Sequence, residues 1–269
     1  MKNILEQFLA KGSKTFSVND VLPYKQQNRS AVLQSIARAE KSGDVMSIAK
    51  GFYVICSPSE KINQSISPTK YISQLMKRLK LDYYVGLLSA ASFYGCTHHR
   101  PIEFQVITFP QNRIKNKHLW NVHFYTSSEI VSRQKCSLIR KEAGEFEFIN
   151  YSTQIVTGYD LVKFEKASGG MYNVILVLKE LLSQIEINHV NKLVLGEVEI
   201  SSIQRLGFLM DKLGYHDLTG PLLKGQVKAR FLEKILLSTL EKKQDNNESR
   251  KANVWKIEDN IDWENIDVT

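Results

Sequence analysis

The sequence has few cysteines and no long apolar run, and each shortage excludes a class of protein. Its three cysteines, at positions 56, 96 and 136, are odd in number and widely spaced, unlike the paired framework of a secreted disulfide-rich domain. No segment approaches the roughly eighteen uninterrupted apolar residues of a membrane-spanning helix. The segment from Met1 to Glu6 also lacks the apolar core and cleavage site of a signal peptide. We therefore expect a soluble protein of the reducing cytoplasm with no membrane partner.

The rest of the composition favours a folded, basic protein with polyanionic partners. Its 269 residues exceed a single domain of about 100–200 residues, so two or three compact units are expected. The formal net charge is +8 and the isoelectric point is near 9.2, which favours nucleic acid as a partner. Residues 241–269 differ, because they carry five basic and eight acidic side chains. We expect them to form an acidic, flexible tail.

The first sixty residues show the order of elements typical of a winged helix-turn-helix. Apolar spacing predicts a first helix that begins near Ile4 and ends near Gly12, and a short second helix within residues 16–22 that is capped by Ser17 or Asn19. Pro23 stops the second helix, because proline lacks the amide hydrogen and clashes with the preceding turn. A third helix is predicted over about residues 28–41. Alternating apolar residues then predict a hairpin, and its tip carries Lys50.

The third predicted helix has the features of a DNA-reading helix. Val32, Leu33, Ile36 and Ala37 have core spacing, so the free face is polar and basic. Arginine and amide side chains read base edges, while lysine mainly neutralises phosphate. The candidate DNA-binding residues are Gln26, Gln27, Asn28, Arg29, Ser30, Gln34, Arg38 and Lys50. The competing interpretation is a small helical bundle with a solvated face that mediates protein contacts.

The remainder of the chain predicts an α+β fold. Residues 57–68 are polar and contain two prolines, which is typical of a linker, so a domain boundary is placed near residue 60. Helices are predicted over residues 69–79, 83–94, 174–185, 203–213 and 231–240, and strands over 103–108, 122–126 and 145–149. The predicted parts are a winged domain at 1–60, an α+β domain at 61–240 and a tail at 241–269. Within the second part, the sheet lies at about 102–150 and the helices at about 155–240.

The middle of the chain contains much of the positive charge. Residues 69–140 hold eleven basic side chains against three acidic ones. Aromatic residues are interleaved with them, and rings that stack on bases beside cations would make a second nucleic-acid surface. Aromatic residues at strand spacing also fit a buried core, so both interpretations stay open at this point.

One segment resembles a known family. It runs from Tyr84 to Pro101, with a helix, small residues and Gly95-Cys96-Thr97-His98, and is followed by the strand Phe104–Thr108. Together with the hairpin strand that ends at Ile55, it resembles the AbiEi family of antitoxins over roughly residues 4–215. The tail has no counterpart in this resemblance.

The resemblance implies a two-part regulator of a type IV toxin–antitoxin system, the kind that acts in abortive infection and phage defence. An N-terminal winged domain would repress the operon by binding inverted repeats of double-stranded operator DNA. A C-terminal domain would counter a nucleotidyltransferase-like toxin encoded next door. The resemblance leaves open whether the toxin is contacted directly and whether one copy or a dimer binds DNA.

Several residue groups also suggest enzymes. Cys96, His98 and His99, with Cys136, His118 or His123, contain the ligand types of a zinc site, but not as two tightly spaced pairs. A cysteine nucleophile at Cys96 or Cys136 has no local signature. Ser168-Gly169-Gly170 lacks the lysine and spacing of a phosphate-binding loop.

A metal-dependent nuclease is the remaining enzymatic alternative. Glu103, Gln105, Asp160 and Lys163 have the residue types, although not the spacing, of a carboxylate cluster that holds magnesium. A stand-alone transcription factor whose body dimerises or senses a ligand is another alternative. Our first expectation is a regulator that is not an enzyme, with no catalytic residue, metal or cofactor.

Overall fold

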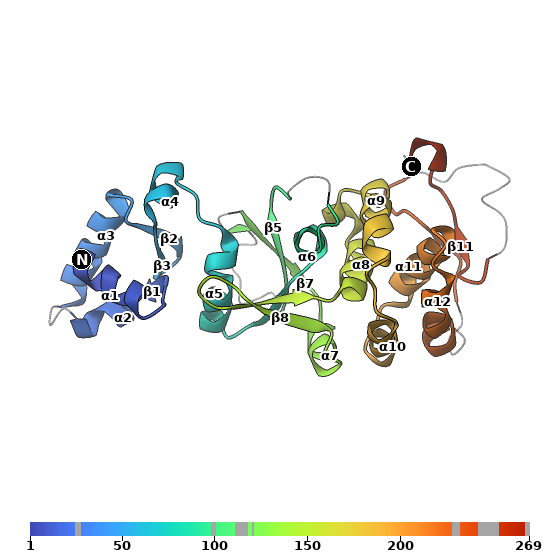
Figure 1. Cartoon of the computed structure of the whole chain (residues 1–269), viewed down its shortest axis with the longest axis horizontal. Coiled ribbons are helices and arrows are strands. Elements are labelled where there is room, and N and C mark those ends of the chain that lie inside the picture. The colour runs from blue at the N-terminus through green and yellow to red at the C-terminus, as the bar shows by residue number, and fades with distance from the viewer. Residues whose placement is uncertain are drawn as a thin grey trace.

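The computed structural model describes residues 1–24, 28–97, 101–110, 121–227, 232–241 and 253–266, and the backbone of 118–119. The molecule is elongated, with a helical N-terminal unit at one end, a sheet in the middle and a group of helices at the other end (Figure 1). The fold is mixed α+β, as predicted. None of the described helices is long and apolar enough to cross a membrane.

The N-terminal unit consists of three helices and a three-stranded sheet. Its elements in chain order are α1 (Lys2–Ala10), β1 (Thr15–Ser17), α2 (Val18–Val21), α3 (Arg29–Lys41), β2 (Val45–Ala49) and β3 (Phe52–Ile55). A single 3₁₀ turn, Leu22–Tyr24, follows α2. The strand order is β1-β3-β2, and both pairings are antiparallel. Strands β2 and β3 form the hairpin that the sequence predicts.

The short second helix has its N-cap at Ser17, one of the two predicted caps, but the residues before it form a strand. Residues 15–17 form β1, in which Phe16 is buried and pairs with Tyr53. The helix starts only after Ser17, because Ser17 and Asp20 form a reciprocal capping box that fixes the first turn at Val18. The apolar pattern of residues 16–22 is therefore divided between a strand and a helix.

The predicted linker between the N-terminal unit and the rest contains a helix, α4 (Pro58–Asn63). Ser57 accepts a hydrogen bond from the amide of Glu60, whose carboxylate in turn accepts from the amide of Ser57. Pro58 occupies the first helical turn, where its missing amide hydrogen costs nothing. A proline and polar residues, which suggested a loop, here begin a capped helix.

A six-stranded mixed sheet forms the centre of the molecule. The strands are β4 (Asp82–Val85), β5 (Phe104–Phe109), β6 (His118–Leu119), β7 (Val122–Thr126), β8 (Ile139–Ala143) and β9 (Phe148–Ser152). Their order is β6-β7-β5-β4-β9-β8. The pairs β5–β7 and β4–β9 are parallel and the others are antiparallel.

Two predictions for the sheet region are wrong in detail. The helix predicted over residues 83–94 is a buried strand, β4, followed by the shorter helix α6 (Leu87–Phe93). Gly86 and Leu87, which has a φ of 54°, make the turn between them. The strand predicted at 145–149 starts at Phe148, because residues 144–147 form the turn between β8 and β9.

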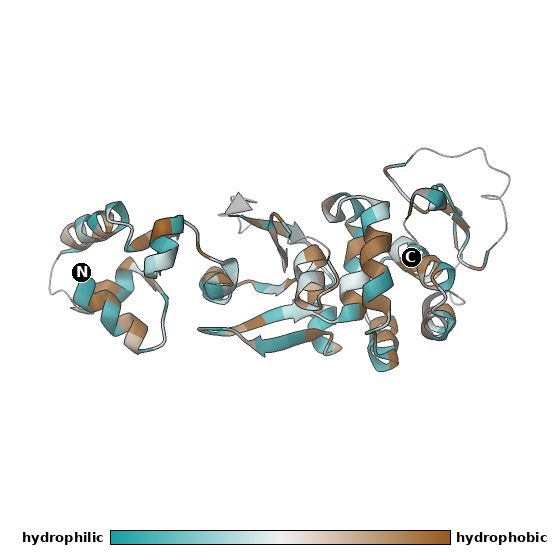
Figure 2. Ribbon diagram, turned by 45° about the horizontal axis from the view of Figure 1, so that its top comes forward, coloured by the Kyte–Doolittle hydropathy of each residue, from teal (hydrophilic) through white to brown (hydrophobic). Residues whose placement is uncertain are grey.

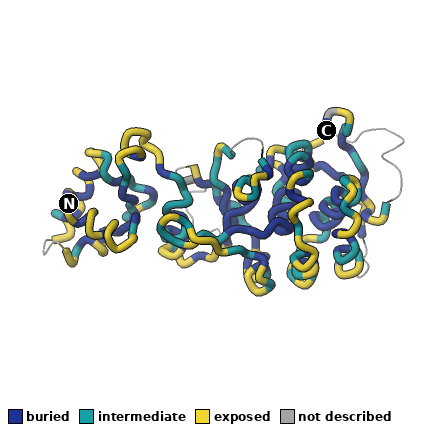
Figure 3. The backbone as a smooth tube through the Cα atoms, viewed as in Figure 1, coloured by how far each residue is buried: buried dark blue, intermediate teal, exposed yellow. Residues whose placement is uncertain are grey.

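Helices cover the sheet and form the second end of the molecule. They are α5 (Ile72–Leu79), α7 (Ile130–Lys135), α8 (Gln154–Lys163), α9 (Met171–Leu182), α10 (Ile187–Leu195), α11 (Ile200–Lys212) and α12 (His216–Leu222). Helices α9 and α11 confirm the predicted helical runs. Helix α10 lies between the predicted helices at 174–185 and 203–213, where no helix was predicted. Figure 2 shows that apolar residues concentrate on the helices beside the sheet, and Figure 3 shows that this region is the most deeply buried.

The last described segments differ from the expectation of a helix and a flexible tail. Residues 232–241 contain the strand β10 (Ile235–Leu236), which pairs in parallel with β11 (Ile257–Glu258). Trp255 is 1% exposed, and its indole nitrogen donates to Asp211 over 2.6 Å. A Cβ atom on Gly207 would lie 2.2 Å from the Trp255 ring, so only glycine leaves room for it. Residues 253–266 are therefore packed against α11.

Candidate nucleic-acid interface

Helix α3 presents one polar face to solvent. Its core side consists of Val32, Ser35, Ile36 and Ala39, which are all buried. The exposed residues are Arg29, Ser30, Leu33, Gln34, Ala37, Arg38, Glu40 and Lys41. The predicted polar residues thus lie together on the free side. Leu33 and Ala37, which were predicted to lie in the core, belong to this exposed face, and Leu33 is 42% exposed.

The beginning of α3 is held by its own side chains. Asn28 is the N-cap, and its Oδ1 accepts a hydrogen bond from the amide of Ala31 over 2.9 Å. The Arg29 guanidinium donates to Asn19 Oδ1 over 3.2 Å, which links the start of α3 to α2. Asn28, predicted to contact DNA, therefore has a capping role. Gln26 and Gln27 lie outside the described residues.

Further along α3, Arg38 and Gln34 are one helical turn apart. The Nε of Arg38 lies 3.4 Å from the carbonyl oxygen of Gln34, and both side chains are exposed. Their spacing places a guanidinium and an amide on the same strip of the helix. Leu33 and Ala37 lie on the same exposed face and supply apolar surface that the sequence pattern did not identify.

The hairpin tip, residues 49–51, lies between β2 and β3. Gly51 has a φ of 68°, a conformation that favours glycine, and it makes the tight turn after Lys50. Lys50 is exposed and has no hydrogen bond or ion pair with any other described residue. Its ammonium is therefore available to an anion.

A buried ion pair joins the N-terminal unit to the rest of the chain. Glu60 accepts hydrogen bonds from Lys14 over 2.7 Å, and Lys70 lies 3.2 Å from its other oxygen. Lys70 also pairs with Glu145 at the β8–β9 turn, over 2.8 Å. Burial opposes ionisation of Glu60, but the hydrogen bonds from Lys14 and Ser57 outweigh it and lower its pKa to about 2. The carboxylate is thus an ionised anchor between the two regions.

A second group of charged side chains is buried beneath the sheet. Glu129 accepts from Arg133 over 3.0 Å, from Tyr159 over 2.8 Å and from Lys163 over 2.9 Å. Arg133 has no exposed surface, and its guanidinium lies 4.6 Å above the Tyr159 ring. We call these residues, together with Asp160, the buried ionic cluster.

Asp160 differs from Glu129 in this cluster, because its environment favours the protonated, neutral carboxyl group. It is fully buried and accepts a hydrogen bond from the Tyr84 hydroxyl over 3.0 Å. Burial raises its pKa to about 7, although the charge of Arg133 opposes this shift. Within the described part of the chain, Asp160 Oδ1 and the Nε and Nη1 atoms of Arg133 have no hydrogen-bond partner.

These contacts separate the residues that suggested a nuclease. Glu103 is partly exposed and bonds to His123 over 3.0 Å, whereas Asp160 belongs to the buried ionic cluster. Cys96 is buried, and His98 and His99 lie outside the described residues. Among the residues that the structure describes, no group of three histidine, cysteine or carboxylate side chains could hold a metal ion.

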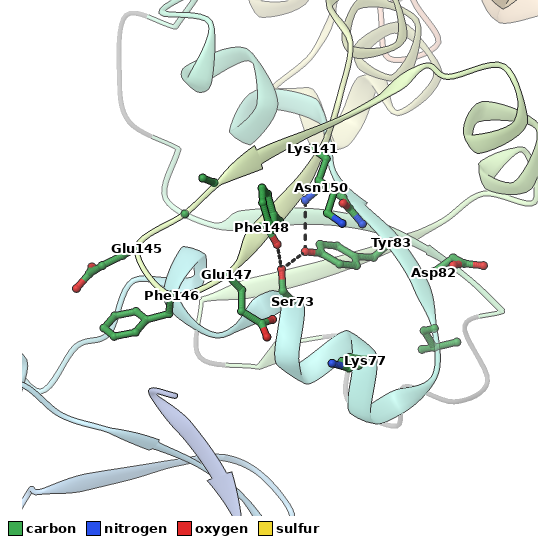
Figure 4. A pocket seen from close by; sticks show the side chains of 13 residues that line it. Ser73, Lys77, Asp82, Tyr83, Lys141, Glu145, Phe146, Glu147, Phe148 and Asn150 are labelled. Atoms are coloured by element: carbon green, nitrogen blue, oxygen red, sulfur yellow. Dashed lines mark hydrogen bonds between the residues drawn. The ribbon is translucent and has the colours of Figure 1, made fainter. Parts of the chain in front are cut away.

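A cavity of about 650 Å³ lies between α5 and the turn that joins β8 to β9 (Figure 4). Its lining carries charges of both signs, among them Lys77, Lys141, Asp82 and Glu145. Ser73 bonds to the Tyr83 hydroxyl and to the carbonyl oxygen of Phe148 at its wall. The cavity therefore marks the place where α5 meets the β8–β9 hairpin, and its charges do not converge on one point.

The comparisons with known proteins concern the fold and one domain. The fold is similar to that of the RV2827C protein from Mycobacterium tuberculosis, with a TM-score of 0.70, over 95% of this chain and 89% of that one. The two sequences are 13% identical, so this likeness concerns the fold alone. No curated protein matches the chain. Residues 84–212 match the family model of the AbiEi antitoxin C-terminal domain. Over these residues, which are slightly less than half of the chain, the sequence is similar to the AbiEi antitoxin family.

Proposed function

We propose that this protein is a cytoplasmic antitoxin that represses its own operon. On this proposal the N-terminal unit is a winged helix-turn-helix that binds double-stranded operator DNA, with α3 as recognition helix and the β2–β3 hairpin as wing. The C-terminal domain counteracts a nucleotidyltransferase-like toxin. The AbiEi domain at residues 84–212 supports an antitoxin role in a toxin–antitoxin system.

Two observations carry the DNA-binding proposal: the exposed polar face of α3 and the exposed, unpaired cation Lys50 at the hairpin tip. An α-helix fits the major groove, where arginine pairs with guanine and glutamine with adenine. Arg29, Gln34 and Arg38 supply these groups. Exposed Leu33 adds apolar surface of the kind that contacts thymine methyl groups. Lys50 would neutralise a backbone phosphate.

The charge distribution supports the same assignment. The chain carries a net charge of +8, and cations released from DNA upon binding drive the association of basic proteins. The capped start of α3 adds the positive end of a helix dipole near the proposed phosphate contacts. We propose that two copies bind an inverted repeat, one on each half-site.

We assign the antitoxic function to the body, which is the part of the chain that follows the N-terminal unit. The family match lies within it, because the match begins in β4 and ends at the last residue of α11. The carboxylates that would have supported a nuclease lie apart, Asp160 buried and Glu103 at the surface. The body is therefore proposed to act through binding or through another noncatalytic route, and not by cleaving nucleic acid.

Two measurements in cells test the two halves separately. Repression is followed with a reporter placed behind the DNA upstream of this coding sequence, and antitoxicity as growth when the neighbouring gene is co-expressed. We expect Arg29→Ala/Arg38→Ala to lose repression and keep the rescue of growth. A matched control, Lys135→Ala on α7, should keep both. Absence of rescue by the wild-type chain would contradict the antitoxic half, and full repression by the double variant would contradict the assignment of α3.

A further inference from the structure

The C-terminal end of α5 carries two cations that no other described residue neutralises. Lys77 and Arg78 are in the last turn of the helix and are exposed. Neither forms a hydrogen bond or an ion pair with another residue that the structure describes. Cations in a last helical turn suit the helix dipole, but neither side chain binds the terminal carbonyls of α5. They are therefore free to bind an anion.

These cations lie next to the wing, although they are more than twenty-five residues away in sequence. The position that a Cβ atom would take on Gly51 lies 3.5 Å from Nη2 of Arg78. A shared cavity of about 570 Å³ is lined by Asn19 and Phe52 of the N-terminal unit and by Lys77 and Arg78 of α5. Arg78 thus borders the hairpin tip from outside the N-terminal unit.

Apolar packing holds the hairpin against α5. Ile48 and Phe52 of the hairpin belong to the same apolar core as Ile72 and Leu75 of α5. Glu60 of α4 adds a polar connection, because it pairs with Lys14 of the N-terminal unit and with Lys70, which lies just before α5. Because both connections are buried, we expect α5 to keep its place beside the wing when the protein binds a ligand.

Acidic side chains also lie near this site. Asp20 lines the shared cavity, but its carboxylate accepts a hydrogen bond from the amide of Ser17 over 2.7 Å. Asp82, Glu145 and Glu147 line the neighbouring cavity with Lys77, and Glu145 is paired with Lys70. The shared cavity itself is lined by three cations, Lys11, Lys77 and Arg78, against the single carboxylate of Asp20, so the end of α5 that faces the N-terminal unit carries an excess of positive charge.

We infer that Lys77 and Arg78 bind DNA backbone phosphates beside the phosphate that the wing contacts. This inference rests on the proposed DNA-binding function and extends the DNA contact from the N-terminal unit onto the antitoxin body. The contact is to phosphate alone, so it strengthens binding to every sequence equally. Consequently the N-terminal unit without α5 makes only part of the DNA contact.

The test is the salt dependence of DNA binding by the full-length variant Lys77→Ala/Arg78→Ala. Each phosphate contact adds about 0.9 to the slope of log K against log salt concentration, so the slope should decrease by about 2. The ratio of affinities for upstream and scrambled duplexes should stay unchanged. The charge-matched control is Lys135→Ala/Lys166→Ala, which removes two exposed cations, one at the end of α7 and one in the 3₁₀ turn after α8, and should keep the wild-type slope.

The outcomes separate this inference from the function on which it rests. A wild-type slope in the α5 variant, with sequence preference intact in both proteins, would overturn only the α5 contact. A changed sequence preference would also overturn it, because phosphate contacts carry no sequence information. Absence of sequence preference in the wild-type protein would instead contradict the proposed operator binding. The reversal Lys77→Glu/Arg78→Glu should lower the slope further than alanine does, and circular dichroism checks that both variants are folded.

Discussion

The N-terminal unit and the body use charged residues in opposite ways. In the N-terminal unit, Arg29 and Arg38 lie at the surface of α3, and among the described residues each makes a single, long hydrogen bond. In the body, Arg133 is completely buried and bonded to Glu129. Exposed charges contribute little to stability and remain available to a ligand, whereas removal of one buried partner leaves an uncompensated charge. The same residue type is therefore expected to serve binding in one region and folding in the other.

The largest expected effect comes from breaking the buried ionic cluster. Arg133→Ala leaves Glu129 and Asp160 without the guanidinium, so the free energy of unfolding should fall by about 3–5 kcal/mol. Arg38→Ala, which removes an exposed guanidinium, should change it by less than about 0.5 kcal/mol. Urea unfolding followed by circular dichroism compares the two variants. Equal losses would remove the distinction between the two regions.

Asp160 should make the body less stable as the pH rises. Its folded pKa of about 7 lies above the ordinary value of 3.8, so the folded state binds a proton that the unfolded state releases. Stability is fully present below about pH 4 and falls by about 1.4 kcal/mol per pH unit until the pH reaches about 7. Asp160→Asn should abolish this decline, while the exposed control Asp217→Asn should retain it. Parallel curves for wild type and Asp160→Asn from pH 4 to 7 would contradict the assignment.

Glu60 should have the opposite pH dependence. Its folded pKa of about 2 lies below its ordinary value of 4.5, so its contribution is present above pH 4.5 and is lost as the pH falls toward 2. Between pH 5 and pH 3, the stability difference between wild type and Glu60→Gln should shrink by roughly 2 kcal/mol. Glu6→Gln, an exposed change on α1, serves as the control. A difference that does not vary over this range would show that Glu60 is not an ionised anchor.

The smallest expected effect concerns Asn28, which the structure assigns to capping α3. Asn28→Ala should lower the free energy of unfolding by about 1 kcal/mol through the lost hydrogen bond to Ala31, whereas Asn28→Ser should restore most of it. We expect both variants to keep the ratio of affinities for upstream and scrambled DNA. Loss of that ratio in the serine variant would indicate that Asn28 reads a base edge after all.

The sequence predicted elements well where a single local pattern decided them. The existence and bounds of helix α3 follow from its apolar spacing, although Leu33 and Ala37, two of the four residues assigned to its core, lie on the exposed face. Two assignments failed because the same apolar spacing fits both a strand and a helix. Phe16, assigned to a helix, lies in the strand β1. Residues 83–94, assigned to one helix, contain a strand and a helix that are divided at Gly86. Only the capping box of Ser17 and Asp20 and the turn at Leu87 settle these boundaries.

Contacts between residues that are distant in sequence could not be predicted, because no local pattern encodes them. Nothing local to Trp255 indicates that it packs against Gly207 of α11, because that contact joins residues 48 positions apart in sequence. The approach of Arg78 to the hairpin tip is likewise created by the shared core of the hairpin and α5. The charge excess of residues 69–140 suggested a nucleic-acid surface, and among the described residues of this segment Lys77 and Arg78 are exposed and line a cavity shared with the N-terminal unit.

The most direct test of the central claim is fluorescence anisotropy of the full-length protein on its upstream DNA and on a scrambled duplex of equal length and composition. An operator-reading protein should prefer the upstream site by about 10³ or more. Arg29→Ala/Arg38→Ala should lose this preference and stay as stable as wild type within about 0.5 kcal/mol. Equal affinity of the wild-type protein for both duplexes, with a steep salt dependence, would contradict the claim and reduce the interaction to nonspecific electrostatic attraction.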